Sequence, residues 1–418
     1  MNVPLFHNRD LAALARESYT ADDLAAIDAA LRSHGTLRFV RLPTGLFPAS
    51  SAGESIEASG YGNVWVRDNV FVAYAHHVVG ESGVAADVAC TLLRFFDRYR
   101  ARFDNVIAGN TGLGHRPHVR FNGKDLTEIE ERWPHAQNDA LGYFVWLFAE
   151  LALSGAFEPT GRELDTLLLF PRFFEAIRYW QDEDSGHWEE VRKISASSIG
   201  TVVAGLESLA RLVNDDAIAA IAARGRQALA EILPNECVQM SPRQNRRYDA
   251  ALLFLIHPLK VVDGPMAALL LHDTARYLTG DIGIRRYLLD SYYAPDFDRD
   301  YPEEKRTADH SAGTETRDVL IGDVGEEAQW CMFDPILSAY YGTRGDAARQ
   351  TYHFNRALAQ ITELWQCPEL YYLQSVESGP REFRPNTHVP LLWTQANLMI
   401  ALETMHRTLS HDRREASR

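Results

Sequence analysis

Apolar residues return every three or four positions through most of the chain. This period, typical of α-helices, covers residues 20–33, 65–79, 84–103, 137–153, 162–180, 195–213, 216–232, 248–256, 265–278, 326–342, 345–363 and 389–408. We therefore predict twelve helices, the first opened by a capping box at Thr20 to Asp23. Residues 36–42 alternate enough for a short strand, and a loop rich in Ser and Gly follows to residue 61. Since no stretch between the helices has the pattern of a central strand, the predicted class is all-α.

The predicted helices fall into two alternating kinds. Those near residues 65, 137, 195, 248, 326 and 389 are apolar around most of their circumference, as helices buried on several sides are. The helices between them have polar faces, for example at Arg94 and Arg98 or at Arg224 and Arg226. Six buried helices alternating with six half-exposed ones predict an (α/α)6 barrel. A superhelical stack of helical hairpins is the alternative.

Charged, amide and aromatic groups stand at or just before the starts of the buried helices. They are Arg67 and Asp68, Gln137 to Asp139, Glu189 and Glu190, Asp249, Glu326 and Glu327, and Trp393. The half-exposed helices have no such set. In a closed barrel the N-termini of the inner helices point to one end, so we expect these groups to converge on one cavity, where helix dipoles favour anionic groups. Taken one at a time, an acid or amide at a helix start is equally consistent with a cap.

The first of these groups combines an ion pair with aromatic rings. Arg67 donates hydrogen bonds in a rigid fork and Asp68 accepts them, so together they can hold sugar hydroxyls from two sides. Tyr61 and Trp65 offer flat faces to the apolar side of a pyranose ring. The alternative is a buried structural ion pair.

Two further stretches place a tryptophan beside polar groups. Trp133 precedes Asn138 and Asp139, so it is expected to stack on a sugar while one of these residues caps the next helix; the alternative is a cap with a core tryptophan. In the polar loop 182–191, Glu189 follows Trp188 and precedes a second carboxylate. A carboxyl in such surroundings keeps its proton to higher pH, as a general acid must. Residues 182–184 alone are expected to form a solvated acidic turn.

Glu369 is the candidate for a second catalytic carboxylate. It stands between Pro368 and an aromatic run, in the stretch before the last buried helix. Glycoside hydrolysis with inversion needs two carboxyl groups on opposite faces of the bond, ~6.5–9.5 Å apart. An ordinary loop glutamate is the alternative, and the competing carboxylates are Glu326, Glu327, Glu377 and Glu382.

Charge and cysteine usage exclude several classes of function. The net charge is −15, without a basic block, so neither nucleic acid nor an anionic membrane is an expected partner. Cys90, Cys237, Cys331 and Cys367 are widely spaced, so neither a zinc site nor a disulfide framework is expected. His76 and His77 face about 100° apart on a helix and do not predict a metal pair. We see no signal peptide and no run of about 18 apolar residues, so the expected location is the cytoplasm.

Several motifs, taken together, resemble glycoside hydrolase family 15, the glucoamylase family. The three that carry this resemblance are Tyr61-x3-Trp65-x-Arg67-Asp68, Trp133-x3-Gln137-x-Asp139 and Trp188-Glu189-Glu190. Four later motifs, and the run 193–198 with Ser195 in place of Asn, are similar to the glucoamylase-like domains of phosphorylase kinase α and β subunits. The later motifs are Arg285-Arg286-Tyr287-Leu288 with Asp290, Tyr292 and Tyr293, then Glu327-x2-Trp330, Pro368-Glu369-Leu370-Tyr371-Tyr372 and Pro390-Leu391-Leu392-Trp393.

The resemblance implies an (α/α)6 barrel that hydrolyses α-linked glucosides from the chain end, with inversion and without a cofactor or metal. It implies Glu189 as general acid and Glu369 as general base. The residues that it implies for substrate binding are Tyr61, Trp65, Arg67, Asp68, Trp133, Asp139, Trp188, Glu190 and Arg286, with Glu190 reaching the second sugar. The expected organisation is one domain over residues 1–418, including an N-terminal extension of about 45 residues.

Two departures from the family pattern leave alternatives open. His135-Ala136 stands where Arg-Pro is usual, and the motif around Glu369 is of the kinase-subunit type. The chain also has no β-sandwich or starch-binding module, so a small oligosaccharide is the expected substrate. The alternatives are a carbohydrate-binding or regulatory domain without turnover, or another (α/α)6 enzyme such as a trehalase-like hydrolase or a phosphorylase.

Overall fold

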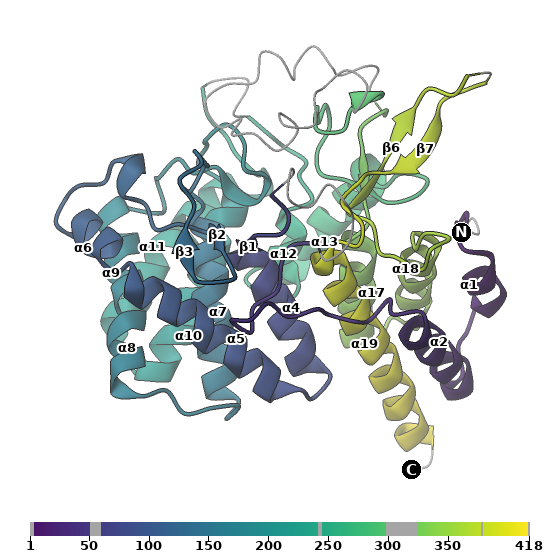
Figure 1. Ribbon diagram of the computed structural model, residues 1–418, viewed down its shortest axis with the longest axis horizontal. Coiled ribbons are helices and arrows are strands. Elements are labelled where there is room, and N and C mark those ends of the chain that lie inside the picture. The colour runs from purple at the N-terminus through teal and green to yellow at the C-terminus, as the bar shows by residue number, and fades with distance from the viewer. Residues whose placement is uncertain (1–3, 51–59, 241–244, 298–324, 378, 417–418) are drawn as a thin grey trace.

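The computed structural model describes residues 4–50, 60–240, 245–297, 325–377 and 379–416, and most of its regular structure is helical (Figure 1). Six helices form an inner ring: α4 (Val66–Val78), α7 (Asn138–Leu153), α10 (Ala196–Val213), α12 (Leu252–Ile256), α17 (Phe333–Thr343) and α19 (Leu392–Ala416). Helix α19 packs on α4, so the last inner helix meets the first. This closure confirms the predicted (α/α)6 barrel and excludes an open stack of hairpins.

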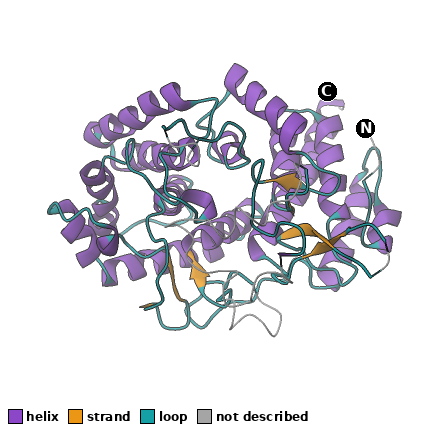
Figure 2. Ribbon diagram, turned by 90° about the horizontal axis from the view of Figure 1, so that it is seen from above, coloured by secondary structure: helices purple, strands orange, loops and turns teal. Residues whose placement is uncertain are grey.

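A second set of helices lies outside the ring. It comprises α2 (Ala21–Ser33), α5 (Ser82–Arg98), α8 (Gly161–Leu167), α9 (Leu169–Ile177), α11 (Asp216–Ile232), α13 (Gly264–Asp273) and α18 (Ala347–Ala359). Two further short helices are α1 (Arg9–Leu14) and α6 (Ala101–Ile107). Seen from above, the helices surround a centre covered by loops (Figure 2). The capping box predicted at Thr20 and Asp23 is confirmed at the start of α2.

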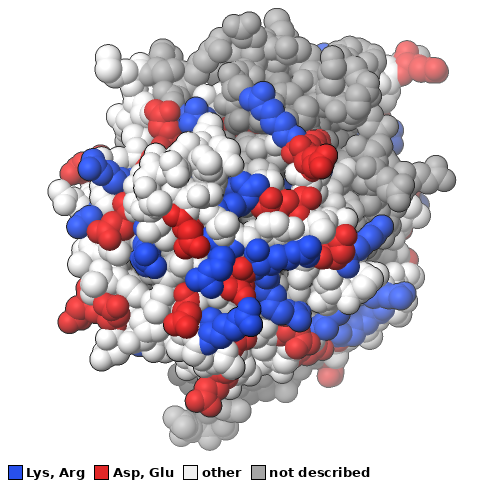
Figure 3. Space-filling view, turned by 60° about the vertical axis from the view of Figure 1, so that its left-hand side comes forward, with Lys and Arg blue, Asp and Glu red and all other residues white. Residues whose placement is uncertain are grey.

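Charged side chains of both signs are interspersed on the outer face of the barrel (Figure 3). Several of them pair between neighbouring helices, as Arg226 does with Glu207 at 2.7 Å and Arg224 with Glu175 at 3.2 Å. Such exposed pairs contribute little stability each. They agree with the half-exposed character that the sequence predicts for the outer helices.

Aromatic rings fill the middle of the barrel. Phe71 of α4 lies 5.2 Å from Tyr143 of α7 and 5.5 Å from Phe254 of α12, between ring centroids. Phe254 in turn lies 5.7 Å from Phe333 of α17 and stacks on Trp393 of α19 at 5.5 Å. Because five of the six inner helices meet through these rings, the barrel has a packed core and not a central channel.

Helices α7 and α10 approach more closely than side chains usually allow. A Cβ at Gly142 would lie 2.7 Å from the backbone nitrogen of Val202, and one at Gly205 would lie 2.6 Å from the carbonyl oxygen of Gly142. Both positions therefore require glycine. Helix α10 is the one described helix long and apolar enough to span a membrane, yet 72% of it is buried inside the protein, as expected of a core helix.

Two small antiparallel sheets, which the sequence pattern did not predict, lie near the N-terminal ends of the inner helices. The first contains β1 (Val64–Trp65), β2 (Arg120–Asn122) and β3 (Thr127–Glu128). The second contains β4 (Ile284–Arg285), β5 (Gln329–Trp330), β6 (Leu370–Gln374) and β7 (Glu382–Pro385). Most of these strands are too short to display a period of two. They matter for function because β1 leads directly into α4 and β6 begins immediately after Glu369.

Other local predictions were wrong. Residues 36–42 form no strand, because the backbone there pairs with side chains and loops; Gln395 of α19, for example, donates to the carbonyl oxygen of Arg38 at 2.8 Å. Helix α17 begins at Phe333 rather than at residue 326, since 329–330 pair in β5. The segments 84–103 and 162–180 each divide into two helices, and helix α12 occupies only the end of 248–256.

Each end of the barrel has a cavity of its own. Residues near the N-termini of α4, α10 and α19 surround one cavity, which contains Arg67, Glu189 and Trp393. The C-terminal ends of α4, α7 and α10 surround a second, wider cavity of about 960 Å³, which contains Trp146 and Glu150. The predicted convergence on one cavity is therefore observed for Arg67, Asp68, Glu189 and Trp393. The other members of the predicted set do not line the cavity: residues 137–139, Glu190, Asp249, Glu326 and Glu327.

Candidate active site

Nine of the eleven predicted site residues line the cavity at the N-terminal end of the barrel. They are Tyr61, Trp65, Arg67, Asp68, Trp133, Trp188, Glu189, Arg286 and Glu369. The wall is completed by Ala49, Pro134, His187, Tyr292, Trp330, Leu391 and Trp393. The cavity has a volume of about 100 Å³, and much of its wall is aromatic. Aromatic faces with a few convergent polar groups are typical of a carbohydrate pocket.

Glu189 follows a short 3-10 turn, Gly186–Trp188, in the loop before α10. The backbone of Glu189 is left-handed, with a φ of 58°, and Gly186 has a φ of 56°. A left-handed glutamate is uncommon and costs conformational energy, so the surrounding structure must hold it. Trp188 anchors this turn, because its indole nitrogen donates to Asp249 at 2.9 Å.

The loop that carries Glu189 is closed by buried polar contacts. Asp184 pairs with Lys193 as an isolated antiparallel bridge, and the backbone nitrogen of Asn138 donates to the Asp184 carboxylate at 2.8 Å. Asp184 is only 1% exposed, so the expected solvated turn at 182–184 is wrong for this residue. Burial raises the pKa of Asp184 to about 8. The carboxyl is therefore largely protonated at neutral pH.

Two donors hold the Glu189 carboxylate. The indole nitrogen of Trp65 donates to Oε1 at 3.0 Å, and the guanidinium of Arg67 lies 3.3 Å from the same oxygen. Burial raises the pKa of Glu189 above its ordinary value, while Arg67 and Arg120 hold part of that rise back. A carboxyl that keeps its proton longer than usual is suited to general-acid work.

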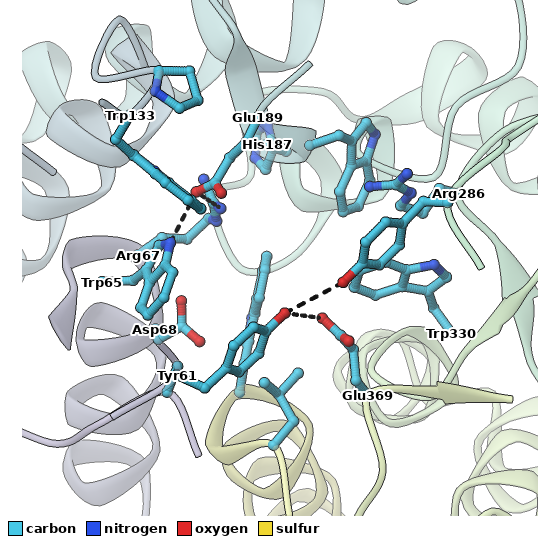
Figure 4. A pocket seen from close by; sticks show the side chains of 16 residues that line it. Tyr61, Trp65, Arg67, Asp68, Trp133, His187, Glu189, Arg286, Trp330 and Glu369 are labelled. Carbon is cyan, nitrogen blue, oxygen red and sulfur yellow. Dashed lines mark hydrogen bonds and ion pairs between the residues drawn. The ribbon is translucent and has the colours of Figure 1, made fainter. Parts of the chain in front are cut away.

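Three side chains contact the Glu369 carboxylate. The hydroxyl of Tyr61 donates to Oε1 at 3.0 Å, and the amide of Asn386 donates to Oε2 at 2.5 Å. The Nδ1 atom of His388 lies 3.1 Å from Oε2. Glu369 is 4% exposed. Figure 4 shows Glu189 and Glu369 on opposite sides of the pocket, with open space between them.

Arg286 occupies an aromatic enclosure in the pocket wall. Its guanidinium lies about 5 Å from the ring centroids of Trp188, Tyr292 and Trp330. Asp290 accepts from it at 2.6 and 2.7 Å, and Glu190 accepts at 2.9 Å. A planar guanidinium that is both stacked and ion-paired has little freedom to rotate. Arg286 is therefore a fixed donor at the edge of the pocket.

Asp139 and Glu190 are the two predicted site residues that do not line the pocket. Asp139 lies behind Arg67 and accepts from its guanidinium at 2.9 Å. Glu190 lies behind Arg286 and also accepts from Arg246 at 3.1 Å. The structure thus places these two acids in buried ion pairs with the arginines, behind the wall of the cavity.

Asp68 contributes a buried carboxylate to the wall of the cavity. Burial raises its pKa to about 7; Arg67 opposes this rise, while the negative charges of Glu189 and Glu369 add to it. In Figure 4 the side chain lies below Trp65, on the side of the cavity opposite Arg286. Sugar hydroxyls are strong donors to such a carboxylate once it is ionised.

Several residues of the site were absent from the sequence-based set. Tyr292 and Trp330 line the cavity, and both lie inside motifs that carry the family resemblance, so they had a recognisable signal. Asn386 and His388 had none, because they stand in an irregular stretch after β7. Among the described residues no group of three or more His, Cys, Asp or Glu side chains is arranged to hold a metal ion.

Solved structures share this fold. A wild-type glycosidase superposes with a TM-score of 0.68 at 19% identity, covering 94% of this chain and 99% of that one. A variant glycosidase in complex with glucose gives 0.70 at 18% identity, covering 93% and 99%. A bacterial glucoamylase complexed with acarbose gives 0.58 at 17% identity, covering 87% and 53%. At these identities the likeness establishes the fold alone.

Curated relatives include regulatory subunits. A probable phosphorylase b kinase regulatory subunit alpha from Caenorhabditis elegans is 25% identical over 401 residues, which cover 81% of this chain and 30% of that protein. The liver isoform from Mus musculus is 26% identical over 319 residues, covering 67% and 24%. The chain thus spans about a third or less of the length of these subunits. The sequence model for glycosyl hydrolases family 15 matches residues 25–246, more than half of the 418 residues, and the chain therefore belongs to this family.

Proposed function

We propose that this protein is an inverting hydrolase that releases glucose from the ends of α-linked gluco-oligosaccharides. The observation that carries the proposal is the pair of carboxyl groups, Glu189 and Glu369, facing each other across an aromatic pocket. Trp393 lines the pocket and stacks on Phe254 in the middle of the barrel, so it closes the pocket toward the core. A pocket closed on that side admits a chain end more readily than the middle of a chain. The four cysteines are widely spaced in the sequence and suggest no disulfide framework, and we propose a cytoplasmic location.

In this proposal Glu189 is the general acid and Glu369 the general base. The Glu189 carboxyl gives its proton to the glycosidic oxygen, and the leaving sugar departs with the bonding electron pair as an alcohol. A water molecule attacks the anomeric carbon from the opposite face, and Glu369 takes one proton from that water. Each proton transfer typically contributes ~10²–10⁴-fold to the rate. The released glucose is β-configured, because attack and departure occur on opposite faces.

The remaining wall supplies binding for the terminal glucose. Asp68 accepts from sugar hydroxyls and Arg286 donates to them, while Trp65 and Trp133 provide aromatic faces. No cofactor takes part in this scheme. Arg67 has a second task, since its charge lies beside Glu189 and helps to stabilise the carboxylate left after proton donation.

A screen of α-linked glucose disaccharides with wild type and Glu189→Gln tests the proposal. We expect hydrolysis of at least one disaccharide by wild type, loss of activity in the variant, and the β-anomer appearing first in a proton NMR time course. The α-anomer appearing first would exclude inversion. Turnover that depends on phosphate would identify a phosphorylase instead.

The similarity to phosphorylase kinase regulatory subunits supports a second candidate, a sugar-binding regulatory domain without turnover. This candidate predicts that glucose or maltose binds in calorimetry while no disaccharide is hydrolysed. A sugar-bound crystal structure separates the two candidates as well, because hydrolysis requires a water molecule between Glu369 and the anomeric carbon.

A further inference from the structure

We propose that His388 is a positioning residue for the general base, and that it orients Glu369 and Tyr61 together. The inference rests on the proposed function, in which Glu369 is the base. His388 does not line the pocket, is 4% exposed, and comes from the loop between β7 and α19. It contacts the base and one of the base's donors at the same time.

The contacts of Glu369 divide its two oxygens into different roles. Oε2 receives the Asn386 amide at 2.5 Å and faces His388 Nδ1 at 3.1 Å, and neither of these residues lines the cavity. Oε1 receives the hydroxyl of Tyr61, which does line the cavity. Oε2 is therefore turned into the protein, and Oε1 is the oxygen available to a water molecule. The contacts at Oε2 thus determine that Oε1 is the oxygen that accepts the proton from water.

His388 also fixes the donor on the cavity side. Its ring stacks on the ring of Tyr61, with centroids 3.7 Å apart and planes 7° from parallel. The ring of Tyr293 meets His388 edge-on at 6.2 Å. Because one face of the imidazole supports Tyr61 while its Nδ1 edge contacts Glu369, rotation of His388 would disturb both oxygens of the base.

We assign the hydrogen at the contact with Glu369 to the imidazole. A base that begins as a carboxylate has only acceptor sites, so Nδ1 is the donor to Oε2. The Asn386 amide, which lies 3.2 Å from Nδ1, donates to the same oxygen. The titratable groups that face His388 or its carboxylate partner are Tyr61, Tyr292 and Asp68, together with Tyr293 and Cys331.

Two consequences for the reaction follow. A hydrogen bond to the ionised form of a carboxylate favours that form, so losing the His388 donor means that the base is ready only at higher pH. The acid limb of the kcat profile should therefore move to higher pH. Since His388 does not touch the space where the sugar binds, KM should change little.

Paired variants separate donation from stacking. His388→Phe keeps a ring against Tyr61 but removes the donor, while His388→Asn returns an amide donor near the place of Nδ1. His257→Phe is the matched control, because His257 is a buried histidine far from the pocket, next to a proline that lines the second cavity. All three are compared with wild type by kcat and KM from pH 4 to 8, after thermal unfolding has verified that each one folds.

For His388→Phe we expect kcat to fall by about 10-fold, KM to stay within about twofold, and the acid limb to move to higher pH. His388→Asn should recover most of kcat, and His257→Phe should match wild type. If His388→Phe does not fold, His388→Ala with and without added imidazole replaces it, and imidazole should restore kcat. An acid limb that coincides with that of wild type would overturn this inference but not the proposed function. An Asn variant as impaired as the Phe variant would do the same. A wild type that hydrolyses no α-linked glucoside would overturn the proposed function as well.

Discussion

Glu189 and Glu369 face the same cavity, but neighbours of different kinds hold them. On the Glu189 side the partners are an indole and a guanidinium, and burial raises the pKa of the acid against the opposing charge of Arg67. On the Glu369 side the partners are a phenol, an amide and an imidazole, which donate without a guanidinium among them. The pKa raised by burial suits Glu189 to give a proton away. Glu369 accepts hydrogen bonds at both oxygens, which suits a group that must be held in place to take a proton from water.

The two sides also differ in how the chain builds them. The Glu189 side comes from the inner helices α4, α7 and α10 and the loops before them, all within the region that matches the family model. The Glu369 side comes from the second small sheet and the loops around it, which lie beyond residue 246. The family match therefore covers the proposed acid but not the proposed base. Whether the protein hydrolyses its sugar or only binds it depends on the Glu369 side.

The strongest test of this comparison replaces each of the two carboxylates in turn. Glu189→Gln and Glu369→Gln should each lower kcat on an oligosaccharide by ~10²–10⁴-fold, because each removes one proton transfer. The two variants should differ on α-glucosyl fluoride, since fluoride leaves without a proton. Glu189→Gln should keep most of its activity on that substrate, and Glu369→Gln should not. Equal behaviour of both variants on the fluoride would contradict the assignment of distinct roles.

Asp68 connects the two sides, and its substitution should have the next largest effect. Asp68→Asn removes a charged acceptor for sugar hydroxyls, so kcat/KM should fall by about 10–100-fold. Burial raises the pKa of Asp68 to about 7, so the ionised acceptor is populated above that pH. Glucose affinity of wild type, measured by calorimetry, should therefore increase from pH 6 to pH 8.

The Asn variant supplies the control for this titration. Its side chain does not ionise, so its affinity for glucose should be nearly constant over the same range. A wild-type affinity that does not change with pH would show that Asp68 stays in one protonation state or does not touch the sugar.

The acid side was readable from the sequence, for physical reasons. Arg67, Asp68 and Glu189 stand at or near the starts of strongly periodic helices, and a closed barrel brings such positions together. The carboxyl beside Trp188 predicts a retained proton, and burial does raise the pKa of Glu189. The barrel itself follows from the alternation of buried and half-exposed helices.

The base side was less readable, because it depends on long-range pairing. Strands of two residues, such as β4 and β5, carry no periodic pattern, and only the folded chain brings Asn386 and His388 to Glu369. Residue type also does not show whether a side chain lines a pocket or lies behind the residues that line it. Glu190 has the composition of a substrate ligand, yet it lies behind Arg286 as the partner that orients it.

Removing one neutral donor from each carboxylate compares the two sides with a smaller change. Trp65→Phe removes the indole donor to Glu189, and Tyr61→Phe removes the hydroxyl donor to Glu369. Each should lower kcat/KM by about 5–10-fold, the usual effect of one hydrogen bond. Trp65→Phe should further raise the pKa of Glu189 and so move the basic limb of the pH profile upward.

Tyr61→Phe should leave that basic limb in place and move the acid limb instead. Tyr74→Phe, at the opposite end of the barrel, is the control and should match wild type. If both pocket variants moved the same limb, the two carboxylates could not be assigned opposite roles.

The smallest expected effect on activity concerns the loop that supports Glu189, where the change appears in stability instead. The pKa of Asp184, raised to about 8 by burial, lies far above the value for an unfolded aspartate. Between these two pKa values the folded state binds more protons than the unfolded state, so the free energy of unfolding falls as pH rises from about 4 to about 8. Asp184→Asn resembles the protonated form and cannot ionise. Thermal unfolding should therefore show little difference between variant and wild type at pH 4, and a variant more stable by roughly 3–6 kcal/mol at pH 9.

Asp182→Asn provides the matched control for this substitution. Asp182 accepts from Arg116 at 2.7 Å, so its loss should destabilise the protein at every pH in this range instead of stabilising it at high pH. Activity of Asp184→Asn should stay within about twofold of wild type, since the buried carboxyl holds the loop in its protonated form. If Asp184→Asn were destabilised equally at pH 4 and pH 9, the carboxyl would be ionised in the folded protein. The left-handed turn at Glu189 would then be supported by a buried charge. Ion pairs, and not a protonated carboxyl, would hold the loop on the acid side.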